Sequence, residues 1–237
     1  MSDTKIGIYQ LPYDYLFCGF SLSLIYDDSE TNYYWSKDFS ASYYIAQAKA
    51  GFIAIMDTVC DEQVLLPEIG FSYSILDFEN LHISKKVAKL IKNKQLTITI
   101  DDNLEEIREY IAKTHKRCWV EKRYISILRE TQNIKDSNFR VITVYIEYNG
   151  EIVAGEIGYI IGKTYTSLSG FSNKEYNSFG IAQMVLLGKK LQKAGFDFWN
   201  LGQPYMAYKN QLGAKDYDRI DFLERWYQSI DKEEPII

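Results

Sequence analysis

A strand, a helix and a second strand follow one another between residues 164 and 201, and this order constrains the fold more than any other part of the sequence. The segment TYTSLSGF is rich in aromatic and β-branched residues, which favour a strand. FGIAQMVLLGKKLQKAG has apolar residues at helical spacing, and Gly195 stands where a helix commonly ends. FDFWNLG predicts a short buried strand. A crossover helix makes the two strands parallel, so we expect a ligand site beyond their carboxyl ends, where Gln203, Tyr208 and Lys209 follow.

The rest of the chain supplies further helices and strands. Helices are expected in SASYYIAQAKAG, SKKVAKLIKNK, DNLEEIREYIAKTH and WVEKRYISILRETQ, with Ser40 and Ser84 as N-caps of the first two. Strands are expected in FIAIM, LTITID, FRVITVYIEY and EIVAGEIGYII. The Asn149-Gly150 pair predicts a tight hairpin between the last two of these strands. FCGFSLSLIY alternates around Gly19 and also predicts a strand.

These elements together predict the fold class. Helices, an antiparallel hairpin sheet, a crossover helix and a last parallel strand make the topology of the N-acetyltransferase (GNAT) superfold. We therefore predict an α+β fold in which residues 80–237 form a GNAT-like domain with a mixed sheet flanked by helices. Residues 1–79 are expected to form a small α+β N-terminal domain. Topology of this kind does not fix the chemistry.

Charge and cysteine usage restrict the binding partners and the cellular compartment that we expect for the protein. A net charge of -5 disfavours a general nucleic-acid coat but leaves room for a local basic patch. Cys18, Cys60 and Cys118 are an odd, widely spaced set, which favours reduced thiols in the cytoplasm over disulfides. His82 and His115 are too few and too far apart in sequence to indicate a metal site. No run approaches the roughly 18 apolar residues of a membrane span, so we expect a soluble, cytoplasmic protein. We also expect it to act as a monomer.

Several segments, in order, resemble the leucyl/phenylalanyl-tRNA-protein transferase family. They are LHISKKVAKLIKNKQLTITID, Trp119 opening the next helix, VYIEYNGEIVAG, the GFS of Gly170 to Ser172 followed by Asn177, AGFDFWNLGQ and the downstream LGA. KDFSASYYIAQAKAGF is similar to the family's entry segment, so the resemblance covers roughly residues 37–225. It implies an enzyme that moves an amino acid from charged tRNA to the N-terminal α-amino group of a protein, an N-end rule reaction that marks proteins for degradation. Aminoacyl-tRNA would be the co-substrate, and no cofactor is implied.

The sequence also departs from that family. Leu168 stands where the family usually has a glutamate, and Leu201 replaces an aspartate two residues before Gln203. The family's paired tryptophans fall near Pro67 and Glu68, so that wall of the amino-acid pocket is not carried over. The MAYK segment that starts at residue 206 resembles the sister arginyl- and leucyl-transferases, which modify acidic N-termini. The chain therefore resembles a divergent member between the two groups.

Gln203 is the residue that we expect to act in catalysis. Its amide can orient the attacking amine through its oxygen or donate to an oxyanion through its nitrogen, or it can simply tie down the following turn. Lys209 can pair with an acidic acceptor or be a solvated turn lysine. Glu156 lies in the middle of a strand, where an unpaired carboxylate is costly to bury, so it is either exposed or part of a site. The expected substrate-binding residues are Tyr208, Lys209, Glu156, Phe171, Ser172 and Asn177.

A basic helix face is the candidate surface for tRNA. Lys85, Lys89 and Lys92 lie along one stripe of the helix expected after Ser84. Such stripes are often only solvated, but in the related family a basic cluster here touches the acceptor stem. Trp119 can stack on the terminal adenosine or pack in the core. The expected tRNA-binding residues are Lys85, Lys86, Lys89, Lys92, Lys94 and Trp119.

Two other functions stay open at this point. One is an acyl-CoA-dependent N-acyltransferase of the same superfold, which normally shows a glycine pattern where the crossover helix begins. NKEYNSFGIAQ lacks that pattern. The other is a non-catalytic relative that keeps a tRNA or peptide groove without the family's two acids. The sequence does not indicate which amino acid is transferred or which N-terminus receives it.

Overall fold

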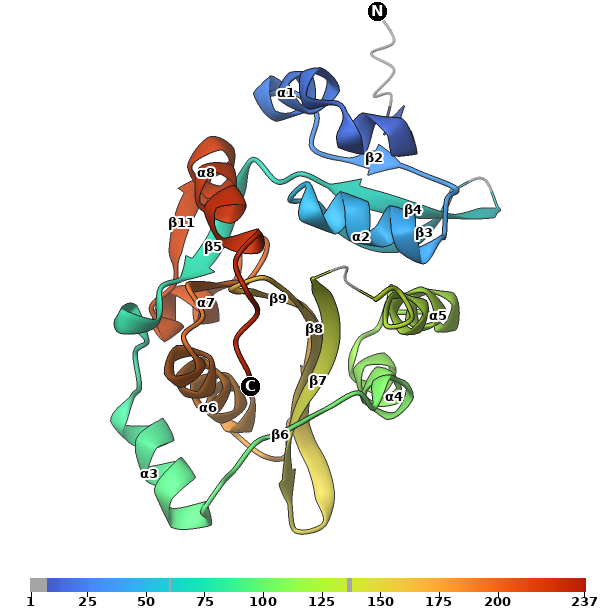
Figure 1. Cartoon of the computed structure of the whole chain (residues 1–237). Helices are drawn as coiled ribbons and strands as arrows, with labels where there is room; N and C mark the ends of the chain where they lie inside the picture. The colour runs from blue at the N-terminus through green and yellow to red at the C-terminus, as the bar shows by residue number, and fades with distance from the viewer. Residues whose placement is uncertain (1–7, 60, 136–137) are drawn as a thin grey trace, which may run out of the picture.

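A seven-stranded sheet lies at the centre of the protein (Figure 1). The computed structural model describes residues 8–59, 61–135 and 138–237. The strand order is β11-β5-β10-β9-β8-β7-β6. β7 (Phe139–Tyr148), β8 (Glu151–Ile161) and β9 (Thr164–Ser172) are antiparallel, whereas β10 (Phe198–Asn200) runs parallel to β9. The sequence-based prediction of an α+β fold with a mixed sheet is confirmed.

The two edges of this sheet come from segments far apart in sequence. β5 (Ser72–Leu76) lies antiparallel between β10 and β11 (Lys215–Asp218), and β6 (Thr99–Asp101) pairs with β7 at the opposite edge. β5 belongs to the segment 1–79 that the sequence assigns to an N-terminal domain, yet its partners are strands of the large sheet. The expected division at residue 79 therefore does not follow the edge of the sheet.

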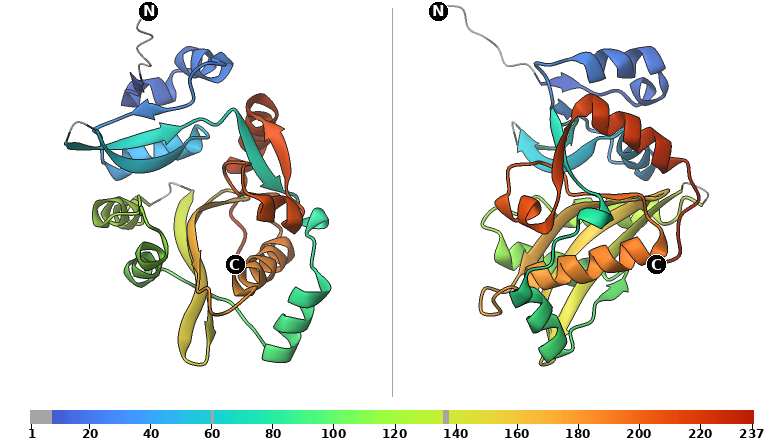
Figure 2. Two further views of the ribbon diagram at one scale, coloured as in Figure 1. Left: turned by 180° about the vertical axis from the view of Figure 1, so that it is seen from behind. Right: turned by 90° about the vertical axis from the view of Figure 1, so that its left-hand side faces the viewer.

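Helices cover both faces of the sheet, as the two further views show (Figure 2). α3 (Lys85–Lys94) and α6 (Phe179–Ala194) lie on one face, and α4 (Leu104–Thr114) and α5 (Lys122–Thr131) lie on the other. The alternation of β7 explains this arrangement: Val141 packs in the core with α4 and α5, and Ile142 packs in the core with α6. The sheet is therefore buried on both sides.

The predicted helix signals are found in the structure. Ser40 and Ser84 accept hydrogen bonds from backbone N–H groups three residues later, at the starts of α2 (Ala41–Lys49) and α3. Gly195 ends α6 with a φ of 91°, a left-handed conformation in which glycine has no side chain to clash. Local sequence thus fixes the boundaries of these helices.

A smaller group of elements precedes the sheet. It contains β1 (Tyr9–Gln10), η1 (Tyr13–Phe17), α1 (Gly19–Asp27), β2 (Tyr34–Trp35), α2, and the antiparallel pair β3 (Ile53–Val59) and β4 (Glu62–Glu68). The strand predicted in FCGFSLSLIY is wrong, because Gly19–Asp27 is helical. Arg219 donates to the backbone oxygens of Ile25, Tyr26 and Asp28, which satisfies carbonyls at the end of this helix. That partner is too distant in sequence for a local pattern to reveal.

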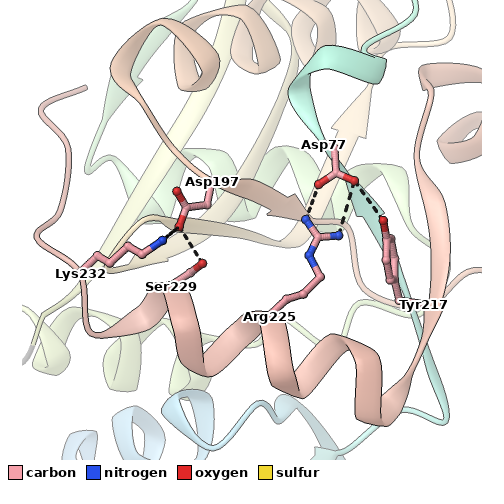
Figure 3. Close-up of polar contacts among 6 residues, drawn as sticks. All are labelled: Asp77, Asp197, Tyr217, Arg225, Ser229 and Lys232. Atoms are coloured by element: carbon pink, nitrogen blue, oxygen red, sulfur yellow. Dashed lines mark hydrogen bonds and ion pairs between the residues drawn. The ribbon is translucent and has the colours of Figure 1, made fainter.

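The C-terminal helix α8 (Arg219–Ile230) joins β5 to β10 (Figure 3). Asp77, which lies between β5 and the short helix η2 (Phe78–Asn80), forms an ion pair with Arg225 and accepts from Tyr217. Asp197, just before β10, accepts from Ser229 at 2.7 Å and pairs with Lys232 at 2.6 Å. These contacts hold the strands that border the candidate site.

Candidate active site

A cleft opens where the parallel strands β9 and β10 diverge. The two strands pair only from Thr164 to Thr166 of β9, although β9 continues to Ser172. On its other side β9 carries a bulge, because Ser167 and Ser169 pair with consecutive residues of β8 and Leu168 is extra. The freed part of β9 and the end of β10 therefore face each other across an open space.

The larger of two adjoining chambers in this cleft has a volume of about 630 Å³. α4, the loop after it, β8, β9, the start of α6 and the segment after β10 line it. Its apolar wall includes Ile111, Trp119, Leu168, Ile181 and Met184. A chamber of this size and character suits an apolar group with a few polar contacts.

A smaller chamber of about 330 Å³ adjoins the first. Its own wall comes largely from β3, β4, β5 and the turn after β10, and includes Tyr33, Glu68 and Gln203. Both chambers share six lining residues, which makes them parts of one cleft. The shared residues are Trp119, Ser167, Leu168, Leu201, Met206 and Lys209.

Gln203, the predicted catalytic residue, lies at the polar end of the smaller chamber. Its Nε2 atom donates to Glu68 Oε2 at 2.7 Å and to the Tyr33 hydroxyl at 2.9 Å. The turn that holds it begins at Gly202, which has a φ of 73° and donates its N–H to Asn200 Oδ1 at 2.9 Å. Asn200 is buried, and its side chain caps the turn.

Glu68 is a carboxyl group that the sequence does not single out as functional. It is half-buried at the end of β4, and burial raises its pKa above the ordinary glutamate value. Hydrogen bonds from Gln203, Tyr33 and Asn32 act in the opposite direction but are outweighed. The structure thus places a carboxyl group beside Gln203, in a cleft whose other lining residues include the uncharged Leu168 and Leu201.

Glu156, a predicted substrate-binding residue, is buried beneath the larger chamber. Its Oε1 atom accepts from Tyr165 and Ser167, each at 2.7 Å, and its Oε2 atom accepts from Gln183 at 3.3 Å. Burial raises the pKa of Glu156 despite these three donors. Ser167 also accepts from Trp199 Nε1 at 2.8 Å, so the carboxyl group is part of a satisfied network in the floor of the cleft.

Lys209 is buried in the structure, so the alternative of a solvated turn lysine is wrong. It belongs to the short helix α7 (Ala207–Leu212) and is only 4% exposed. Its Nζ atom donates to the backbone oxygens of Leu201 and Gln203, both at 2.5 Å. Burial lowers the pKa of Lys209 to about 8. Lys209 thus holds the turn that presents Gln203, and it lines both chambers.

Of the other predicted substrate-binding residues, three line the larger chamber and one does not. Phe171 and Ser172 of β9 line the larger chamber, and Phe171 stacks on Tyr110 with ring centroids 5.0 Å apart. Tyr208 is 36% exposed and lines the same chamber. Asn177 is exposed and lines neither chamber, although its neighbour Ser178 lines the larger one.

The predicted tRNA-binding residues lie in two places. Trp119 is part of the wall shared by both chambers, and it meets Tyr124 edge-on with ring centroids 5.0 Å apart. The lysines of α3 are all exposed but line neither chamber. They form a surface across the sheet from α4 and α5 (Figure 1), and consist of Lys85, Lys86, Lys89, Lys92 and Lys94.

Several cleft residues have no clear signal in the sequence. Glu68 and Tyr33 belong to a segment with no recognised site motif, and Ser167 is one of several serines in its strand. His115, which the sequence suggests is structural, lines the larger chamber and contacts Gly170 O through Nε2 at 2.8 Å. The bulge in β9, the turn after β10 and the end of β4 together bring these residues to one cleft.

Among residues 8–59, 61–135 and 138–237, no cluster of three or more His, Cys, Asp or Glu side chains is arranged to hold a metal ion. No helix in these ranges is long and apolar enough to span a membrane. Cys60 lies outside the described residues.

The mixed sheet, the crossover helix α6 and the cleft between diverging parallel strands define a GNAT-like protein. The chain belongs to the leucyl/phenylalanyl-tRNA protein transferase family, whose model matches residues 75–227. The matched region runs from the end of β5 into α8 and includes Gln203 but neither Tyr33 nor Glu68.

Relatives share this similarity at low identity. The leucyl/phenylalanyl-tRNA–protein transferase of Pseudomonas fluorescens (strain SBW25) is 27% identical over 151 residues, which are 61% of this chain and 62% of the relative. That of Saccharophagus degradans is 23% identical over 202 residues, which are 84% of this chain and 79% of the relative. Among solved structures, the crystal structure of FemX matches with a TM-score of 0.48 and 10% identity, over 79% of this chain and 70% of that one.

Proposed function

We propose that the protein is an aminoacyl-tRNA–protein transferase, which moves an amino acid from charged tRNA to the N-terminal α-amino group of a protein or peptide. The observation that carries this proposal is the two-chambered cleft, in which a larger apolar chamber and a smaller chamber that contains Glu68 and Gln203 meet at Leu168 and Leu201. A transferase of this kind needs one compartment for the donor and one for the acceptor, with the reacting atoms at their junction.

The larger chamber fits the donor. An apolar aminoacyl side chain such as leucine or phenylalanine, the residues in the relatives' names, suits its wall of Ile111, Leu168, Ile181 and Met184. Trp119 offers a face for the terminal adenosine. The exposed lysines of α3 are then available to phosphates farther along the tRNA.

The reaction is an acyl transfer between oxygen and nitrogen. The neutral α-amine attacks the ester carbonyl carbon, a C–N bond forms, and the bond from that carbon to the ribose oxygen breaks. The attacking nitrogen loses a proton and the ribose oxygen leaves as a hydroxyl group. A protein α-amine has a pKa near 7.7–8.0, so part of it is neutral at pH 7. The ester is already activated, which is why no further cofactor is required.

Gln203 orients the amine in this scheme. The carboxyl group of Glu68 can only accept when ionised, so the Gln203 amide must turn its nitrogen toward Glu68. Both Nε2 hydrogens then have partners, Glu68 and the Tyr33 hydroxyl. The amide oxygen is left to accept from an amine, which favours orientation of the nucleophile over donation to an oxyanion.

A transfer assay tests this function. Total aminoacyl-tRNA carrying labelled amino acids is incubated with the protein and peptides that begin with Arg, Lys, Asp, Glu or Met. We expect label in at least one peptide and none in N-acetylated copies. Absence of label with intact tRNA binding would favour a non-catalytic relative. Label from acyl-CoA but not from charged tRNA would favour the other acyltransferase.

The setting of the reaction follows from the same proposal. The acceptor is a free protein N-terminus, and the protein acts as a monomer in the cytoplasm, where charged tRNA is available. Elution of the purified protein at the size of one chain of 27.6 kDa checks the monomer. Co-sedimentation of the protein with membranes would argue against the cytoplasmic setting.

A further inference from the structure

The polar wall of the smaller chamber contains a carboxyl group with no cationic partner. Glu68 Oε1 accepts from Asn32 Nδ2 at 3.2 Å, and Oε2 accepts from Gln203 Nε2 at 2.7 Å. In the described part of the chain, no lysine or arginine forms an ion pair with Glu68. A half-buried carboxylate held only by neutral donors retains capacity for a cation.

The Gln203 amide leaves a second acceptor beside this carboxylate. Its nitrogen is used by Glu68 and Tyr33, and its Oε1 atom has no partner among the described residues. Gln203 is exposed to the cleft, and its backbone oxygen is fixed by the Lys209 ammonium. One charged acceptor at the end of β4 and one neutral acceptor on the turn after β10 therefore lie side by side, and neither depends on a ligand for its position.

We propose that Glu68 and Gln203 form the binding site for the α-amino group of the acceptor's N-terminus, which binds as an ammonium and loses one proton to water before the neutral amine attacks. An ammonium has three donors in a compact charge, which suits one carboxylate oxygen and one amide oxygen. Glu68 provides the charge that selects a free amino group, and Gln203 provides the direction of its approach. The proposal rests on the proposed function, because it assigns the acceptor side of that reaction.

The carboxylate of this site comes from the N-terminal elements of the chain. Leu168 and Leu201, which line the junction of the two chambers, are uncharged. The carboxylate instead comes from β4, outside residues 75–227 that the family model matches. β4 is brought there by the bridge between Tyr33 and Glu68 and by its pairing with β3. Glu68, a residue of the N-terminal elements, thus lines a cleft whose other walls belong to the large sheet and its helices.

Peptide binding tests the site without any transfer. A fluorescent dipeptide with a free α-amine and its N-acetylated copy are titrated against the wild-type protein at neutral pH. We expect the free amine to bind at least about tenfold more tightly, as the loss of a charge-assisted contact implies. Glu68→Gln should remove this preference, and Glu68→Asp should weaken it because the shorter side chain withdraws the carboxylate.

Glu62→Gln is the matched control. Glu62 lies at the other end of β4, is exposed and pairs with Lys37, so its neutralisation changes the net charge equally without touching the cleft. It should keep the preference for the free amine. Thermal unfolding curves that coincide for the variants and the wild type establish that the fold is retained.

The outcomes separate this site from the proposed function. Equal binding of the free and acetylated peptides by the wild type, or an unchanged preference in Glu68→Gln, would overturn the site even if transfer occurs. A preference for the free amine that depends on Glu68 would support the site even if charged tRNA gives no transfer. Absence of transfer would overturn the proposed reaction but not the site. In the transfer assay, Glu68→Gln should raise the acceptor KM about tenfold and leave the KM for charged tRNA unchanged.

Discussion

The two chambers of the cleft differ in where their walls come from. All residues that line the larger chamber lie between positions 111 and 209, within the region that matches the family. The smaller chamber also takes Tyr33, Ile53, Ile55 and Glu68 from elements that precede that region. The donor side of the proposed reaction is therefore built by the sheet and its helices, whereas the acceptor side depends on how β3 and β4 pack against them. Substitutions should affect the two sides separately.

Gln203 lies in the smaller chamber, and its replacement should give the largest effect on transfer. We expect Gln203→Ala to lower the rate of a single turnover by about a hundredfold, because the amine loses its orienting acceptor. Quench-flow with saturating charged tRNA measures this rate. Gln211→Ala on the exposed side of α7 is the control and should transfer normally. An unchanged rate in Gln203→Ala would break the assignment of the acceptor side.

Glu156 anchors the floor of the larger chamber, and its removal should cost stability. Glu156→Ala leaves the donors of Tyr165, Ser167 and Gln183 without their shared acceptor, so we expect the free energy of unfolding to fall by about 3 kcal/mol. Glu156→Gln should cost less, because its amide oxygen can still accept. Urea unfolding followed by circular dichroism measures both. Equal losses in the two variants would argue against the hydrogen-bond network as the cause.

Trp119 belongs to the wall that both chambers share. Its removal should affect the donor side of the reaction, whereas replacement of Glu68 should affect the acceptor side. Trp119→Ala should raise the KM for charged tRNA about tenfold, through loss of a stacking face, and leave the acceptor KM nearly unchanged. Phe20→Ala on the exposed side of α1 serves as the aromatic control. A rise in the acceptor KM alone would place Trp119 on the acceptor side.

Acceptor binding should depend on pH through Glu68. The carboxylate must be ionised to hold the ammonium, so affinity should fall as pH decreases through the raised pKa of Glu68. Tyr33 and Tyr73 face the same chamber with pKa values raised far above neutrality, and Lys209 titrates at about 8, so none of them produces this acid limb. Deprotonation of the amine and of Lys209, which holds the turn of Gln203 and whose pKa burial lowers to about 8, both contribute to the alkaline limb. Titration of the fluorescent dipeptide from about pH 4 to pH 9, near these groups' ordinary range, should show the acid limb only when Glu68 is present.

The lysine face of α3 should give the smallest effect per residue. Lys85→Ala combined with Lys89→Ala should weaken tRNA binding a few-fold and reduce the salt dependence of that binding by a slope of about one or two. Acceptor binding should not change, because these lysines line neither chamber. Lys189→Ala with Lys190→Ala on the exposed side of α6 is the matched control. Equal effects in both pairs would indicate nonspecific attraction.

Local sequence predicted much of the main fold. Ser40, Ser84 and Gly195 mark helix boundaries that the structure confirms, and the Asn149-Gly150 turn connects β7 to β8 as expected. These signals work because each depends on backbone groups a few residues away. The strand predicted for residues 17–26 is wrong for the opposite reason, because the helix found there is completed by Arg219, which lies far along the chain.

The sequence by itself determined the order of elements, the parallel pair β9 and β10, and the place of Gln203 just beyond their ends. Only the tertiary structure decided that Lys209 is buried under that turn and that Glu68 lies 2.7 Å from Gln203 across 135 positions of the chain. Helix and strand periodicities relate residues only a few positions apart, so they cannot predict a contact between residues this far apart in sequence. Which charge reaches the cleft is set by how β4 packs against the sheet, and packing depends on the shapes of surfaces assembled from the whole chain.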